Sequence, residues 1–131
     1  MAFDINFENN YRGVLFQAYG HLTGEDFLEI SNTVYNFDQS RKVEYQIMDL
    51  TEVEEVDVEL SDLESLAALD SDAGARKPGM KIAVVVPPGK IEELTYVWAE
   101  LCEGSGLEIQ VCRDMTTARS WISQSVLEAF T

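Results

Sequence analysis

The run Met80–Val86 (MKIAVVV) constrains the fold most strongly, because it is short, almost wholly apolar and rich in β-branched residues. Its length fits a β-strand, and a strand that is apolar on both faces belongs in the middle of a parallel sheet covered by helices. Pro87, Pro88 and Gly89 end the run and introduce a helix, since proline is accepted in a first helical turn. The run therefore predicts an α/β protein.

Strand and helix patterns alternate on both sides of this run. Phe3, Ile5 and Phe7 alternate with polar residues, and Asn9-Asn10 tolerates the positive φ of a tight turn, which predicts a hairpin with a returning strand over 11–19. Further strands are predicted over 45–50 and 107–112. Apolar residues recur at helical spacing after Thr23. Thr23 is a plausible N-cap of this helix, and Asp26 places an acid in its first turn. The remaining helices are predicted before Asp70, after Gly89 and after Asp114.

The element order is thus β-β-α-β-α-β-α-β-α over a single domain, residues 1–131. Alternating strands and helices favour right-handed crossovers between parallel strands. We therefore predict a mixed, mostly parallel sheet of about five strands, with an initial β-hairpin and four helices.

An acidic segment follows the strand predicted over 45–50. Acidic side chains recur from Glu44 to Asp72 and no Lys or Arg lies among them. We expect residues 51–64 to form a loop and the start of a helix. Ser61 and Glu64 match a capping box, although Asp57 is an alternative cap for a helix that starts at Val58. Residues 70–79 (DSDAGARKPG) are rich in turn residues and are expected to be a loop.

The charge balance limits the classes of partner. Twenty-four acids against nine bases give a formal net charge of -15. Such a chain repels phosphate backbones and anionic lipid, so we expect neither nucleic acid nor membrane surfaces as partners. A basic protein partner is favoured, and adaptation to a salty habitat explains the acidity equally well. The chain shows no basic, apolar leader and no membrane-length apolar run, so we expect a cytoplasmic protein.

The element order resembles the anti-sigma-factor antagonist fold of STAS type, and more closely its uncharacterised SpoIIAA-like branch. The resemblance rests on Tyr45–Asp49 followed by a helix, on the strand Met80–Val86, and on Ala118 and Trp121 near the end. In that family a serine within Asp-Ser-Ser-Gly is phosphorylated where a strand meets a helix. The equivalent segment here is 57–60 (DVEL), which keeps the aspartate and lacks both serines and the glycine. Ser61 is the nearest hydroxyl and is interpreted as a helix cap.

Other chemistry finds little support in the sequence. The acids lack the regular spacing of a calcium loop, and one histidine with two cysteines does not make a Cys/His metal cluster, so we predict no metal, no cofactor and no catalytic residue. Cys102 and Cys112 are expected to pack in the interior. Lipid-transfer domains of related fold hold apolar ligands between helices and sheet, but the helices here are expected to be too short for such a cavity.

We therefore predict a non-enzymatic regulatory or protein-interaction domain that docks a partner through the acidic loop and helix start at 51–64. Asp57, Glu59, Ser61 and Asp62 are the predicted partner-binding residues, with Leu60 and Leu63 anchoring the helix beneath. The alternative is a small-molecule or lipid-binding domain, or an enzyme of unrecognised type, with a pocket near His21 and Asp49. Homodimerisation through an edge strand or a helix face is left open.

Overall fold

The computed structural model describes residues 3–37 and 42–129, and side chains up to residue 124. Five strands form one mixed sheet in the order β1-β2-β3-β4-β5, which is also their order in the chain. β1 is antiparallel to β2 and the other neighbours are parallel. The strands are β1 (Phe3–Glu8), β2 (Gly13–Thr23), β3 (Tyr45–Asp57), β4 (Lys81–Val85) and β5 (Glu108–Cys112). The predicted mixed α/β sheet is confirmed.

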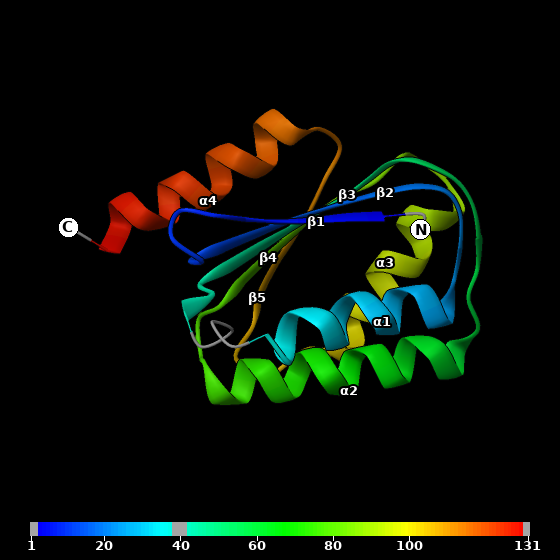
Figure 1. Ribbon diagram of the computed structural model, residues 1–131, viewed down its shortest axis with the longest axis horizontal. Helices are drawn as coiled ribbons and strands as arrows, with labels where there is room; N and C mark the ends of the chain where they lie inside the picture. The colour runs from blue at the N-terminus through cyan, green and yellow to red at the C-terminus, as the bar shows by residue number, and fades with distance from the viewer. Residues whose placement is uncertain (1–2, 38–41, 130–131) are drawn as a thin grey trace.

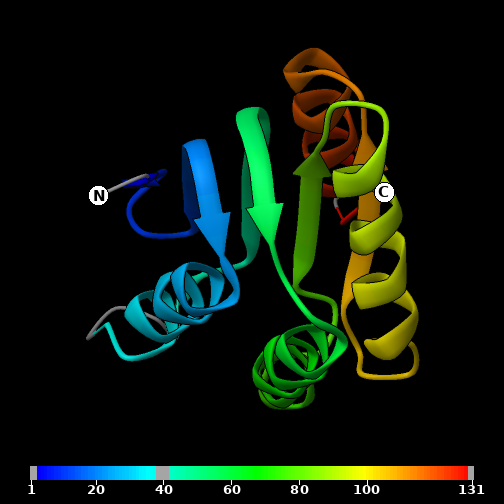
Figure 2. The same ribbon diagram turned by 90° about the vertical axis from the view of Figure 1, so that its right-hand side faces the viewer.

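Four helices cover the two faces of the sheet unequally (Figures 1 and 2). Crossovers of one hand between strands in sequential order return on one face. Accordingly the three connecting helices share a large core with one face, while the last helix folds back over the other face on a smaller cluster around Ile47, Val85 and Ala118. The helices are α1 (Gly24–Tyr35), α2 (Leu60–Arg76), α3 (Lys90–Leu101) and α4 (Met115–Ala129).

The local signals for the first turn and for the cap of α1 are confirmed. Asn9 and Asn10 have φ of 52° and 55° and join β1 to β2, with Tyr11 also at positive φ. At the start of α1 the Thr23 hydroxyl accepts a hydrogen bond from the Asp26 backbone N–H, and the Asp26 carboxylate accepts one from the Thr23 N–H at 2.8 Å. These reciprocal bonds satisfy two donors that a helix start otherwise leaves unpaired.

Three predicted boundaries are wrong, all in the same direction. β2 continues through His21 to Thr23, so the predicted loop after Tyr19 is strand. β3 continues to Asp57, so the first half of the predicted acidic loop is also strand. α2 continues to Arg76, so most of the predicted loop over 70–79 is helix. In each case buried side chains extend the element, because packing against the core outweighs the weak local preference of polar residues for loops.

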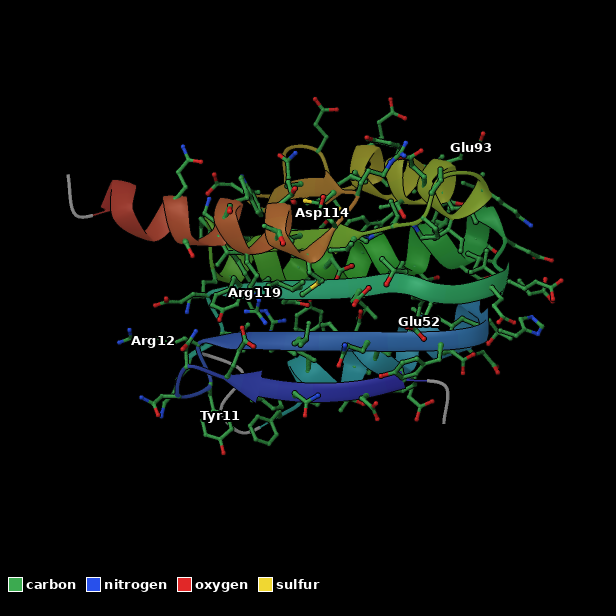
Figure 3. The ribbon with its side chains drawn as sticks, turned by 90° about the horizontal axis from the view of Figure 1, so that it is seen from above. Tyr11, Arg12, Glu52, Glu93, Asp114 and Arg119 are labelled. Atoms are coloured by element: carbon green, nitrogen blue, oxygen red, sulfur yellow. The ribbon has the colours of Figure 1, made fainter. Side chains whose placement is uncertain are left out.

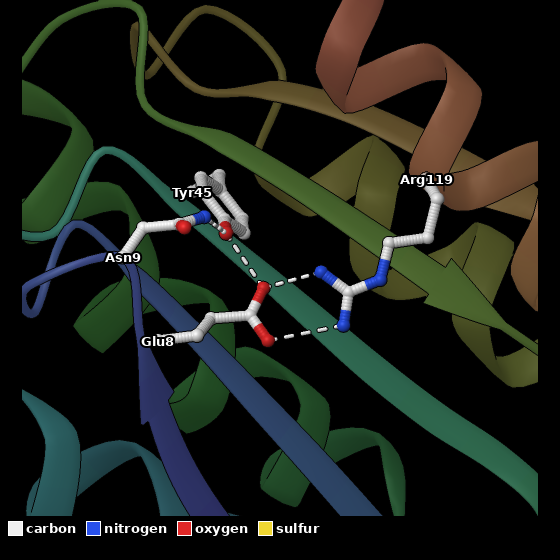
Figure 4. Close-up of polar contacts among 4 residues, drawn as sticks. All are labelled: Glu8, Asn9, Tyr45 and Arg119. Carbon is white, nitrogen blue, oxygen red and sulfur yellow. Dashed lines mark hydrogen bonds and ion pairs between the residues drawn. The ribbon is translucent and has the colours of Figure 1, made fainter.

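α4 is tied to the β1–β2 hairpin by a polar cluster (Figure 4). The Glu8 carboxylate accepts hydrogen bonds from both terminal nitrogens of Arg119, one of them at 3.0 Å, and from the Tyr45 hydroxyl at 2.6 Å. Asn9 donates to the same hydroxyl at 2.6 Å. The guanidinium lowers the pKa of Glu8. A bidentate pair of this kind sets orientation as well as distance, so it places α4 on the sheet.

Candidate functional site

The exposed acids of the predicted site lie on an overhanging strand. β4 pairs with β3 only from Tyr45 to Asp49, so the second half of β3 pairs with β2 alone. We call residues 51–59 the acidic strand end. Its Val53 and Val56 are buried in the core, whereas its acidic side chains are exposed: Glu52, Glu54, Glu55, Asp57 and Glu59. Figure 3 shows Glu52 on this segment, on the side of the sheet that carries α4.

The four predicted partner-binding residues lie together where β3 meets α2. Asp57, Glu59 and Ser61 are exposed, and Asp62 is half-buried. The segment 57–60 runs from the last residue of β3 to the first residue of α2, the same kind of junction that the family resemblance implies. Leu60 is 61% exposed, so the prediction that it anchors the helix beneath is wrong, whereas Leu63 is buried as expected.

The cap of α2 differs from the prediction. The N-cap is Glu59, whose backbone N–H donates to the Asp62 carboxylate at 2.8 Å, and Ser61 lies inside the first helical turn. Asp62 also contacts the start of α1 closely, because a Cβ placed on Gly24 would lie 2.2 Å from its carboxyl carbon. Asp62 therefore holds α2 in place and is less available to a partner than its neighbours.

His21 and Asp49, the predicted pocket residues, lie apart on neighbouring strands. His21 is exposed on β2 beside Glu55, whereas Asp49 lies beside Gln17, four residues back along β2 or about 13 Å. The Asp49 carboxylate accepts hydrogen bonds from the Thr51 N–H at 3.0 Å and hydroxyl at 2.6 Å. Neither residue lines the apolar cavity in the core of the molecule.

That cavity lies between the sheet and the three helices α1, α2 and α3. It encloses about 60 Å³ and its walls are mainly aliphatic. Asp62, Leu66 and Asp70 line it from successive turns of α2, Val58 and Leu94 are among its half-buried lining residues, and Phe27 and Trp98 add aromatic surface. The helices thus leave a small cavity, which suits only a slim ligand and is far smaller than a lipid requires.

A buried polar cluster lines one part of this cavity. Asp70 is only 5% exposed, and its two carboxylate oxygens accept hydrogen bonds from the Tyr35 hydroxyl at 2.5 Å and the Trp98 indole N–H at 2.9 Å. The Gln46 amide donates to the Tyr35 oxygen at 3.1 Å. Burial raises the pKa of Asp70 to about 6, and the two hydrogen bonds act in the opposite direction.

The sequence contains one signal that indicates a buried Asp70. Leu63, Leu66, Ala67 and Asp70 follow the three- and four-residue spacing of one helix face. Because α2 continues past residue 69, this spacing places Asp70 on the buried stripe. The polar partners Tyr35 and Trp98 come from α1 and α3, and no sequence pattern links them to Asp70.

The structure also bears on the cysteines, on metal binding and on membrane-spanning helices. Cys102 and Cys112 are buried and free, in the two separate cores, as packing residues are expected to be. Among the side chains of residues 3–37 and 42–124, no three His, Cys, Asp or Glu are grouped to hold a metal ion. Within residues 3–37 and 42–129, no helix combines the length and the hydropathy that crossing a bilayer requires.

Comparisons with known proteins point to one fold. No family model and no curated protein matches the sequence. An uncharacterised protein of the DUF3478 family with a SpoIIAA-like fold, from Shewanella loihica PV-4, superposes with a TM-score of 0.56 at 20% identity, over 92% of this chain and 93% of that one. The anti-sigma factor antagonist SpoIIAA in its unphosphorylated form superposes with a TM-score of 0.57 at 13% identity, over 95% and 98%. The chain therefore has the SpoIIAA-like fold that its element order predicts.

Proposed function

We propose that this protein is a regulatory interaction domain that docks a basic protein partner at the acidic strand end and the start of α2. One observation carries the proposal. Exposed acids line the overhanging half of β3 and lead directly to the exposed Leu60, so a charged surface adjoins an apolar side chain. Charge complementarity steers association, and a central apolar contact is typical of binding surfaces.

The fold supports the proposal at a coarse level. The solved structures of similar fold include SpoIIAA, which is named an anti-sigma factor antagonist and hence a regulator. In this chain the strand-to-helix junction carries Asp57 and Glu59 and no serine before Ser61. Permanent negative charge thus occupies the region where the resemblance implies a phosphorylated serine, which favours docking that does not depend on a kinase.

The test is affinity capture from a lysate of the source cells. We expect wild-type protein to retain a partner that a Glu55→Lys/Asp57→Lys variant loses, because the variant reverses two charges at the proposed surface. Both residues are exposed and neither is the N-cap of α2, so the fold is expected to persist. Far-UV circular dichroism checks this.

A matched variant separates site from net charge. Glu100→Lys/Glu103→Lys makes the same change in charge at exposed positions at and beyond the end of α3. This control should retain the partner. Equal capture of the partner by all three proteins would place the docking site elsewhere. Equal loss of the partner in both variants would make the binding a nonspecific effect of net charge.

A further inference from the structure

The cavity beneath α2 contains a charge that no cation of the described chain balances. Asp70 takes part in none of the salt bridges between described side chains. Its pKa is set by burial and by the hydrogen bonds from Tyr35 and Trp98. A carboxylate buried without a counter-charge is costly, so a ligand that brings a positive charge would be held there.

The polar part of the cavity offers free hydrogen-bond acceptors, although Ser31 and Gln46 in its lining also carry donors. A carboxylate can accept about four hydrogen bonds and Asp70 receives two, so acceptor capacity remains. Thr95 also lines the cavity, and its hydroxyl donates to the Ile91 carbonyl at 2.7 Å, which leaves its oxygen as an acceptor. The Gln46 side-chain nitrogen is taken up by Tyr35 and Met80. Such surroundings favour a ligand with several donors over a carboxylate or phosphate.

The rest of the cavity favours hydrocarbon. Leu50, Val56, Leu63 and Leu66 contribute aliphatic walls, and the faces of aromatic rings such as Trp98 attract cations. At about 60 Å³ the space takes a narrow, unbranched chain and excludes bulky groups.

We propose that this cavity binds a slim protonated alkylamine, with its ammonium group at Asp70 and its chain along the aliphatic walls. The site goes beyond docking at the acidic strand end and does not depend on it. The same chemistry is offered by a free amine and by a lysine side chain.

The experiment uses the indole N–H signals of ¹⁵N-labelled protein. The chain has two tryptophans: Trp98, which donates to Asp70, and Trp121, which packs on the opposite face of the sheet. Titration with n-pentylammonium chloride at pH 7.5 should move the Trp98 signal saturably and leave the Trp121 signal in place. The neutral 1-pentanol and the anionic hexanoate, at equal concentrations, should bind at least tenfold more weakly.

Variants locate the site. Asp70→Asn should weaken pentylammonium binding at least tenfold, whereas Glu64→Gln, which removes an exposed charge from the same helix, should change it less than twofold. Leu66→Phe narrows the cavity while keeping Asp70, and should abolish binding even if Asp70→Asn proves unstable. The Glu55→Lys/Asp57→Lys variant should bind pentylammonium like wild type, so failure of docking and failure of this site are separate results.

Two results would overturn the proposal. One is a Trp98 signal that does not respond saturably to pentylammonium, or responds equally to 1-pentanol. The other is unchanged affinity in both Asp70→Asn and Leu66→Phe. The natural occupant could be a lysine side chain or a free amine, and Nα-acetyl-lysine methylamide distinguishes the two. If this compound competes with pentylammonium, a lysine side chain is supported. If it does not compete, a free amine is supported.

Discussion

Among the acids whose side chains the structure describes, Asp70 has the environment that differs most from that of the others. The exposed acids of the strand end keep their charge in water at little cost, whereas Asp70 is 5% exposed and relies on two neutral donors, Tyr35 and Trp98. Hydrogen bonds from neutral groups offset only part of the cost of burying an ionised group. The raised pKa of about 6 expresses that remaining cost.

This raised pKa predicts a specific dependence of stability on pH. The ordinary pKa of 3.8 applies to the unfolded chain, so the folded protein binds the proton more tightly. The contribution of Asp70 to the free energy of unfolding is then fully present below pH 3.8 and is lost as the pH rises through about 6. The difference between the two pKa values corresponds to roughly 3 kcal/mol.

The measurement compares wild type with Asp70→Asn by urea unfolding from pH 4.5 to 7.5. The Asn variant lacks this titration, so its stability relative to wild type should increase across the range by about 2 kcal/mol. Glu64→Gln on the same helix should show no such trend. A difference that stays constant with pH would mean that Asp70 is not a buried titrating group.

At the scale of elements, the most informative is the second half of β3. Its exposed acids resemble a loop in the sequence, yet Val53 and Val56 are buried and the register with β2 continues from Gln17–Asp49 to Thr23–Asp57 with two irregularities. Irregularities add residues to one strand and increase its twist. They let β3 carry two outward acids, Glu54 and Glu55, between the buried Val53 and Val56, which a regular alternation of two does not allow.

A pair of substitutions tests whether this half of β3 is part of the core. Val56→Ala should lower the free energy of unfolding by about 2 kcal/mol, because it removes buried methyl groups and leaves a space behind. Glu54→Ala, two residues earlier and exposed, should change it by less than about 0.5 kcal/mol. Chemical unfolding of both variants measures this. Similar small effects at both positions would indicate a loop that does not contribute to the core.

For the whole molecule, the dominant feature is a net charge of -15 on 131 residues. A charge of this size keeps a protein soluble but opposes its compact state by self-repulsion. The few cations are used in specific pairs, including Arg119 with Glu8 and Arg113 with Glu92. Most of the negative charge is therefore not paired and is sensitive to screening by salt.

We expect sodium chloride to stabilise the protein. Raising it from about 10 mM to about 0.5 M shortens the screening length from about 30 Å to less than 5 Å. The free energy of unfolding should rise by about 1 kcal/mol, or roughly 4 °C in Tm. The Glu100→Lys/Glu103→Lys variant should respond less, since it starts with less repulsion. A thermal melt that is independent of salt, or falls with it, would contradict this account.

Local patterns in the sequence are enough to predict the order and type of the elements, and hence the mixed sheet. The strand Lys81–Val85 is marked by its β-branched run, the hairpin by Asn9-Asn10, and α1 by Thr23 and Asp26. These signals are local, since each depends on residues a few positions apart whose backbone preferences or hydrogen bonds act without the rest of the fold.

The positions at which elements end, and the side chains that meet, depend on packing between distant parts of the chain. Asp57 ends β3 and Arg76 ends α2 because Val53, Val56 and the stripe around Ala73 find partners in the core. The acidic strand end was identified by composition, but its form as a strand beyond β4 depends on the pairing with β2. Asp70 meets Tyr35 and Trp98 from separate helices, 35 and 28 residues away in the chain. Contacts over such separations follow from the packing of whole elements, and no local pattern encodes them.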